Sequence, residues 1–155
     1  MYGIELKQRL LKDWRVRRYF RGVFPCDLLP TYVDPGIPHA FIINLDTHDQ
    51  PGTHWVALYI TSYGHAVYFD SFGVPPFIYS IQAFISRNSR TMVSNAVVIQ
   101  SLTTQTCGFY CIFFITQMCR GANLYEIQQH FDSRFPQRND RIILHLVGSP
   151  RGVIS

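Results

Sequence analysis

The chain has 155 residues, of which 47% are hydrophobic and 15% charged, and its net charge is +4. This length suits one domain over residues 1–155, and the apolar fraction excludes a disordered chain. No apolar run reaches the ~18 residues of a membrane span, and charges interrupt the N-terminal stretch MYGIELKQRL where a secretion signal would be apolar. We therefore expect neither membrane insertion nor secretion.

The basic residues are concentrated near both ends of the chain. The N-terminal group is Lys7, Arg9, Lys12, Arg15, Arg17, Arg18 and Arg21, and the C-terminal group is Arg134, Arg138, Arg141 and Arg151. Surfaces of this kind suit nucleic acid or an acidic partner. A solvated helix face explains them equally well at this point.

Four cysteines bear on the redox environment: Cys26, Cys107, Cys111 and Cys119. An even number permits two disulfides, but three of the four fall on one expected helix, and Cys107 and Cys111 are one turn apart. The chain has no CxxC pair, which argues against a structural zinc site. We interpret the protein as intracellular and reduced.

The first quarter of the chain is expected to be a helix followed by a loop. A helix over about residues 2–21 is predicted by apolar side chains near a 3.6-residue period. These side chains are Ile4, Leu6, Leu10, Leu11, Trp14 and, less regularly, Tyr19. Gly22 to Pro25 break the pattern, and the proline-rich stretch FPCDLLPTYVDPGIP predicts an ordered, irregular loop.

The middle of the chain contains the expected sheet. Short apolar runs predict strands over Phe41–Leu45, His54–Ile60 and Ala66–Asp70. The last two are joined through Tyr63-Gly64, so we expect a β-hairpin. A fourth strand is expected over Ala96–Ile99.

Helices are expected to surround this sheet. One is predicted over about Pro76–Asn88, one follows Cys107, and a shorter one covers Leu124–Phe131, with Pro136 barring its continuation. Residues 142–147 fit a strand or a helix. The order of elements predicts an α+β domain with a small mixed or antiparallel sheet flanked by helices.

Cys107 is a candidate nucleophile because of where its helix begins. The turn-like segment QSLTTQT precedes it, and the uncharged run GFYCIFFITQMC follows it. The unpaired N–H groups and the positive dipole end at a helix N-terminus favour a thiolate. A buried, inert core cysteine is the alternative for Cys107 considered alone.

A cysteine nucleophile needs a base, a group that orients the base, and oxyanion donors. His54 opens one strand of the expected hairpin and Asp70 closes the other, so their side chains should meet. A carboxylate beside a histidine fixes its tautomer and stabilises the imidazolium. Gln100, at the end of the fourth expected strand, is placed to donate to an oxyanion beside the N–H of Cys107.

This order of residues resembles the adenovirus-type cysteine proteases, the adenain family. The matching stretches are GTHWVALYI, VYFDSFG and IQSLTTQTCGFYC. The stretches GVFPCDLLP, FIINLD and YFDSFGVPP are more similar still to proteases of Polinton/Maverick elements and adintovirus-like viruses. The resemblance covers about residues 20–120 and implies a papain-like fold of the adenain and Ulp type.

By this resemblance, Cys107 is the nucleophile, His54 the general base, Asp70 its acidic partner and Gln100 the oxyanion donor. The adenovirus enzyme has glutamate where this chain has Asp70. Gln100 stands seven positions before Cys107 (107 − 100), which is the adenovirus-type spacing. The SUMO and ubiquitin-like proteases place this glutamine one position closer. Gln105 is the rival oxyanion donor.

The resemblance also implies partners. It predicts a monomeric cysteine endopeptidase that cleaves viral capsid and core precursor proteins during virion maturation, in the host nucleus and in the virion. No metal or organic cofactor is implied. The adenovirus enzyme is stimulated by DNA and by a disulfide-linked viral peptide. DNA fits the basic ends, whereas the absence of cysteine between His54 and Cys107 argues against a disulfide-held activating peptide.

Two other functions are compatible with the sequence. One is a deconjugase that removes ubiquitin-like proteins, because related enzymes share the order of residues. The seven-residue spacing from Gln100 to Cys107 argues against it. The other is a catalytically idle DNA-binding or capsid-associated module that works through its basic ends. An intact set of Cys, His, Asp and Gln argues against that module.

Overall fold

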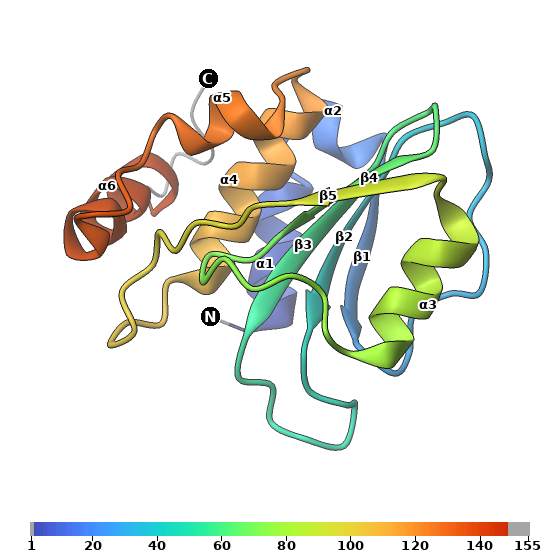
Figure 1. Ribbon diagram of the computed structural model, residues 1–155, viewed down its shortest axis with the longest axis horizontal. Helices are drawn as coiled ribbons and strands as arrows, with labels where there is room; N and C mark the ends of the chain where they lie inside the picture. Colours follow the sequence, from blue (N-terminus) through green and yellow to red (C-terminus); the bar gives the residue numbers. More distant parts are fainter. Residues whose placement is uncertain (1, 149–155) are drawn as a thin grey trace.

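Five strands form one mixed sheet in the order β1-β2-β3-β4-β5, in a computed structural model that describes residues 2–148 (Figure 1). The strands are β1 Phe20–Pro25, β2 His39–Asn44, β3 Trp55–Ile60, β4 His65–Phe69 and β5 Thr91–Ser94. The pairs β1–β2 and β4–β5 are parallel, and the two central pairs are antiparallel. The predicted α+β class and the predicted hairpin are both confirmed.

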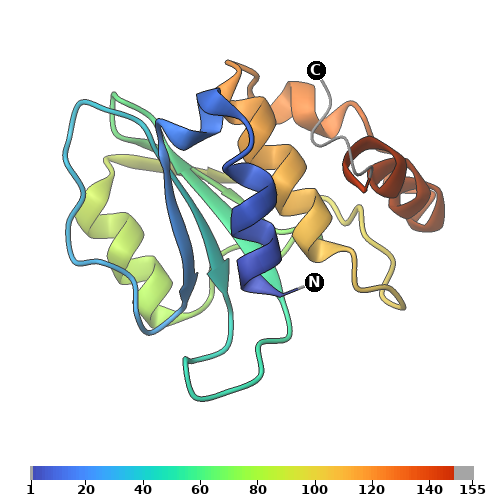
Figure 2. The same cartoon turned by 180° about the vertical axis from the view of Figure 1, so that it is seen from behind.

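Helices cover both faces of the sheet. They are α1 Gly3–Leu10, α2 Trp14–Arg17, α3 Tyr79–Asn88, α4 Cys107–Cys119, α5 Leu124–Gln128 and α6 Pro136–Val147. α1 and α4 run side by side over one face, and α3 covers the opposite face (Figure 2). None of the helices within residues 2–148 has the length and apolar character that a membrane crossing requires.

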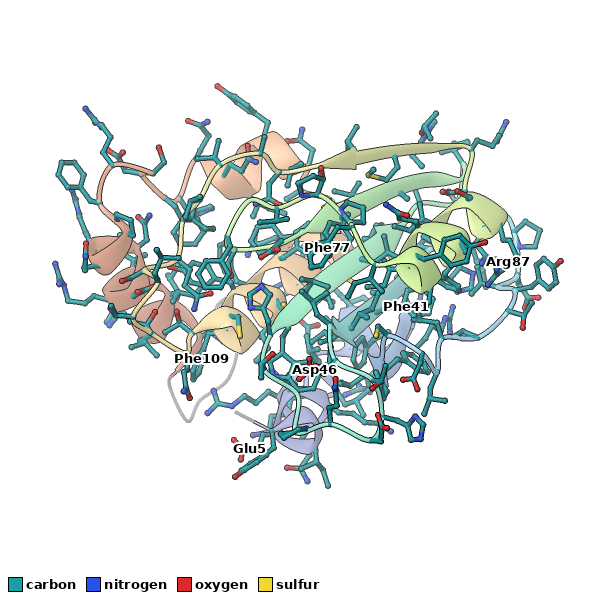
Figure 3. The ribbon with its side chains drawn as sticks, turned by 60° about the horizontal axis from the view of Figure 1, so that its bottom comes forward. Glu5, Phe41, Asp46, Phe77, Arg87 and Phe109 are labelled. Atoms are coloured by element: carbon teal, nitrogen blue, oxygen red, sulfur yellow. The ribbon has the colours of Figure 1, made fainter. Side chains whose placement is uncertain are left out.

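Alternation along the central strands supplies two cores. In β3, Ala57 belongs to the core under α4, whereas Leu58 belongs to the core under α3. The ring of Phe69 stacks on Phe114 of α4 with centroids 4.9 Å apart. On the opposite face Phe41 points toward α3 (Figure 3), where another phenylalanine ring meets it edge-on. The central strands β2, β3 and β4 are therefore buried on both faces, which fixes the strand ends that carry the site.

The first strand was not expected. The segment Phe20–Pro25 was assigned partly to a helix and partly to a loop because Gly22 and Pro25 look like breakers. Gly22 adopts φ +139° at a register shift in the β1–β2 pairing, a conformation that favours glycine. Pro25 is the last residue of an edge strand, where a missing N–H is tolerated. Both residues therefore shape a strand instead of ending a helix.

The predicted N-terminal helix over residues 2–21 is also wrong in its extent. It is divided into α1 and α2, because the Asp13 side chain accepts the N–H of Arg15 at 2.9 Å and starts a new helix. Two side chains assigned to the apolar face, Ile4 and Trp14, are exposed, whereas Leu6 and Leu10 are fully buried.

The fourth predicted strand, over Ala96–Ile99, is wrong, because the strand lies earlier, at Thr91–Ser94. After Ser94 the side-chain amide of Asn95 takes the place of the backbone hydrogen bonds that join β5 to β4. Its Oδ1 accepts the N–H of Asp70 at 2.9 Å, and its Nδ2 donates to the Asp70 carbonyl at 2.5 Å. The chain then continues as an irregular segment beside the residues that follow β4, where the N–H groups of Ile99 and Gln100 donate to the Ser71 carbonyl.

The C-terminal region resolves the open assignment. Residues 142–147 are the second half of α6, and Pro136 is the first residue of that helix, where proline is well tolerated. The shorter helix α5 ends at Gln128, before the predicted Phe131, so Pro136 does not terminate it. Asn123 caps α5 with a complete capping box.

Candidate active site

Cys107 is the first residue of α4, as predicted, and it is buried. The preceding Thr106 occupies the N-cap position, but its side chain makes no capping hydrogen bond. The first N–H groups of α4 therefore keep their partial positive charge beside the sulfur. α4 is buried on nearly every side, so the thiol is held in a rigid part of the molecule.

His54 and Asp70 meet at the open end of the β3–β4 hairpin. His54 immediately precedes β3 and Asp70 immediately follows β4, and Ala57 pairs with Phe69 in between. The imidazole Nε2 donates to Asp70 Oδ1 across 2.7 Å. Asp70 is acceptor-only when ionised, which places the proton on Nε2 and leaves Nδ1 for the thiol.

Backbone contacts hold the Asp70 carboxylate in this position. Its Oδ1 also accepts the N–H of Phe72 at 2.8 Å, and its own backbone is held by the buried side chain of Asn95. Gly73 has φ +70°, and a Cβ there would lie 2.8 Å from the carbonyl carbon of Val97. This close approach keeps the segment after β4 tight against the segment after β5.

The charges in the site favour a thiolate–imidazolium pair. Burial opposes a charged His54, but its hydrogen bonds with Asp70 and Cys107 outweigh burial and raise its pKa to about 9. Burial likewise opposes a charged Cys107. The hydrogen bond with His54 and the N–H groups of Trp55 and Gly108 nevertheless lower the Cys107 pKa. The two shifts together indicate an activated nucleophile.

An aromatic ring fixes the imidazole from one side. Phe72 stacks on His54 with ring centroids 4.7 Å apart and an interplanar angle of 24°. The indole of Trp55 lies near the start of α1, where a Cβ on Gly3 would come within 3.3 Å of it. Phe72 therefore limits rotation of the imidazole, while Trp55 joins the sheet to α1.

The two candidate oxyanion donors differ in their surroundings. Gln100 is buried; its Oε1 accepts the Ser71 hydroxyl at 2.5 Å and its Nε2 donates to the Thr104 carbonyl at 3.0 Å. One N–H of the Gln100 amide is left for another acceptor. Gln105 is exposed and lines the hollow beside Cys107. Gln100 is the fixed group of the two.

A hollow of about 230 Å³ opens directly at the nucleophile. It is lined by Gly52, Thr53, Trp55, Gln105, Cys107 and Gly108. Phe109, labelled in Figure 3, occupies the same first turn of α4 and lies under the guanidinium of Arg9. Within residues 2–148 no group of three or more His, Cys, Asp or Glu is arranged to hold a metal ion.

The structure thus brings Cys107, His54 and Asp70 together and places Gln100 in the loop that leads to Cys107. Sequence reasoning missed the groups that support them. Phe72 lies within the quoted stretch VYFDSFG and could have been weighed as a packing residue. Asn95 and Asp140 carried no signal, because each acts through contacts between distant segments.

Comparisons with known proteins agree with this arrangement. No family model matches the chain. The proteases of Ovine adenovirus D serotype 7 and Fowl adenovirus A serotype 1 are each 26% identical to it in an alignment of 125 residues, which covers 72% of this chain. The chain spans about three fifths of their length, 61% and 60% respectively.

A solved structure shows the same fold. The ASFV pS273R protease superposes with a TM-score of 0.62 at 14% identity, over 90% of this chain and 66% of that one. Similarity in sequence to adenovirus proteases and the fold shared with the ASFV pS273R protease together make the chain adenain-like.

Proposed function

We propose that the chain is a cysteine endopeptidase that cleaves viral capsid and core precursor proteins during virion maturation. The observation that carries this proposal is the pairing of a helix-start thiol with an aspartate-bound imidazole. His54 Nε2 lies 2.7 Å from Asp70, and the pKa of Cys107 is lowered by His54. The similarity to adenovirus proteases supports the viral substrate class.

In the proposed reaction, the Cys107 thiolate attacks the scissile carbonyl carbon and forms a C–S bond. The resulting oxyanion accepts hydrogen bonds from the N–H of Cys107 and the amide of Gln100. The tetrahedral intermediate collapses, the C–N bond breaks, and the imidazolium of His54 gives its proton to the leaving amine. The product of this half-reaction is a thioester on Cys107 with neutral His54.

Water completes the cycle. Neutral His54 takes a proton from water as the oxygen attacks the thioester carbonyl, and the C–S bond then breaks. The acid product leaves, and the proton on His54 restores the ion pair with Cys107. Asp70 stays ionised throughout and stabilises the imidazolium, which requires the 2.7 Å contact seen here.

Purified capsid and core precursor proteins from the same genome are the direct test. They would be incubated with the wild-type chain and with Cys107→Ser, and new termini would be located by mass spectrometry. We expect defined cuts with the wild type only, beside small residues such as glycine by family analogy. Uncut precursors in the presence of a reactive Cys107 would contradict the proposed substrate class.

The same preparation separates the other functions. Release of aminomethylcoumarin from ubiquitin or SUMO conjugates, with precursors left intact, would identify a deconjugase. A catalytically idle module would leave all substrates intact and would keep its biological role in Cys107→Ala. The seven-residue spacing between Gln100 and Cys107 favours the endopeptidase.

DNA and an activating viral peptide are proposed partners. Exposed basic side chains on α1, α2, β1 and the segments between them support a DNA contact: Lys7, Lys12, Arg15, Arg17, Arg18 and Arg21. Binding to a fluorescent duplex should weaken steeply with salt, as phosphate contacts do. An activating peptide would raise cleavage without a disulfide, so its effect should persist in reductant.

We also propose that the protein works as a monomer in the host nucleus and is packaged in the virion. The nuclear and virion locations follow from the proposed substrates. Light scattering after gel filtration tests the first point. Fractionation of infected cells and purified virions, with detection of the chain in each fraction, tests the second.

A further inference from the structure

The loop between Gln100 and Cys107 is fastened to α6 by one buried carboxylate. Asp140 is only 4% exposed, and each of its two carboxylate oxygens accepts two hydrogen bonds. Oδ2 accepts the N–H of Ser101 at 3.2 Å and the hydroxyl of Thr104 at 2.8 Å. Oδ1 accepts the hydroxyls of Thr106 at 3.0 Å and Tyr110 at 2.8 Å.

These contacts are unusual for a buried carboxylate because every one of the four donors is neutral. A carboxylate has about four lone-pair sites, so Asp140 is fully used by the loop and by the first turn of α4. The neighbouring Asn139 extends the attachment, because its Nδ2 donates to the carbonyl of Ile99 at 3.0 Å. The start of α6 therefore holds the segment before Cys107 along its length.

Two consequences reach the reacting groups. Thr106 is the N-cap residue of α4, and its hydroxyl donates to Asp140 instead of capping the helix. The carbonyl of Thr104, whose side chain Asp140 also holds, accepts the Nε2 of Gln100 at 3.0 Å. Asp140 thus holds Thr106, whose peptide group carries the Cys107 N–H, and Thr104, whose carbonyl accepts the Gln100 amide.

We propose that Asp140 is a positioning residue that holds both oxyanion donors, the Gln100 amide and the Cys107 N–H, in their working geometry. This inference rests on the proposed function. It assigns Asp140 no contact with substrate. The imidazolium partner of the thiolate is held by Asp70 at the open end of the β3–β4 hairpin, where Asp140 makes no hydrogen bond within residues 2–148, so Asp140 should affect stabilisation of the oxyanion far more than the thiolate.

This separation defines the experiment. Acylation by p-nitrophenyl N-acetylglycinate forms a C–S bond, releases p-nitrophenolate and passes through an oxyanion. Alkylation by iodoacetamide displaces iodide at a saturated carbon and forms no oxyanion. Both rates would be measured at Cys107 in wild type and in Asp140→Asn, with Asp132→Asn as the matched control because Asp132 binds the Arg134 side chain near the surface.

We expect Asp140→Asn to slow acylation by about 100-fold, on the scale of losing one oxyanion donor. Alkylation of Cys107 should stay close to the wild-type rate, and Asp132→Asn should match wild type in both reactions. Equal rates of acylation in wild type and Asp140→Asn would overturn the inference. So would a parallel fall of acylation and alkylation, because that is the result of general loosening.

A second pair of variants covers the case in which Asp140→Asn does not fold. Thr104→Val removes one hydroxyl that Asp140 holds, and Thr104→Ser keeps it. We expect slower acylation with unchanged alkylation in the valine variant and recovery in the serine variant. Equal acylation in both would overturn the inference. A wild-type chain that is alkylated but never acylated would overturn the proposed function itself, and this inference with it.

Discussion

The imidazole Nε2 of His54 donates to Asp70 Oδ1 across 2.7 Å, joining the residue before β3 to the residue after β4. Because Asp70 is 2% exposed, this contact is shielded from solvent. It also determines which imidazole nitrogen faces Cys107. The contact therefore decides both the tautomer and the charge of His54.

Asp70→Asn should lower kcat by about 10²- to 10⁴-fold, because the neutral amide of asparagine cannot stabilise the imidazolium of His54 as the carboxylate does. Rates of precursor cleavage would be compared with those of Asp27→Asn. Asp27 also contacts a histidine, His48 Nδ1 at 2.5 Å, but at an exposed position away from Cys107. Wild-type activity in Asp70→Asn, or an equal loss in Asp27→Asn, would contradict the assigned role.

The pH dependence of Cys107 alkylation should reveal the ion pair. An ordinary thiol has a pKa of about 8.5, whereas that of Cys107 is lowered by His54. We expect rapid alkylation by iodoacetamide well below pH 8, falling only as pH drops through the lowered Cys107 pKa. In His54→Ala the burial of Cys107 is no longer opposed by the imidazole, so the profile should move to alkaline pH.

The stability of the fold should also depend on the protonation of His54, and this contribution should be lost as the pH rises. The pKa of folded His54 is raised to about 9 from 6.5, so its contribution to stability is complete below pH 6.5 and is lost as pH rises through 9. Melting temperatures of wild type and His54→Ala should therefore converge in that range. His48→Ala is the matched control for the melting temperatures. In the alkylation experiment, a pH profile of Cys107 that His54→Ala leaves unchanged would exclude a preassembled ion pair.

The choice between the two glutamines can be made by substitution. Gln100→Ala should reduce kcat by about 10²- to 10³-fold, as removal of an oxyanion donor does. Gln105→Ala should change kcat little, because this exposed side chain is not held by any group we identify as part of the site. Alkylation of Cys107 should survive in both. A large kcat loss in Gln105→Ala alone would reverse the assignment.

The positions of the candidate catalytic residues were predictable because they follow from local patterns. A polar turn before an uncharged apolar run predicts a helix that starts at Cys107, and a hairpin places its first and last residues together. The supporting groups were not predictable. Asp140 acts on a loop 34 to 39 residues earlier in the chain, and no periodicity connects those segments.

The errors in the predicted secondary structure have a similar cause. The strand β1 contains Gly22 and Pro25, whose usual meaning is a break, and only its position at the sheet edge makes them acceptable. The apolar residues Val97 and Val98 suggested a strand, but both are exposed. The real strand β5 ends before them because Asn95 takes over the hydrogen bonds of Asp70. Tertiary contacts overrode local propensity in both places.

Asn95 provides the last prediction, because it links stability to the site. Asn95→Ala would leave the buried N–H and carbonyl of Asp70 without these partners, at a cost of about 1–3 kcal/mol in the free energy of unfolding. The Asp70 carboxylate should also lose its fixed direction. We therefore expect a lower urea midpoint together with a Cys107 alkylation profile shifted toward alkaline pH.

Asn88→Ala is the control that separates these effects. The Asn88 side chain also makes several backbone hydrogen bonds, with Val33, Thr31 and Phe84, at the other end of α3 from the site. It should lower the urea midpoint by a similar amount and leave the alkylation profile of Cys107 in place. If Asn88→Ala shifts that profile as far as Asn95→Ala does, then the profile reports overall stability and Asn95 has no specific hold on Asp70.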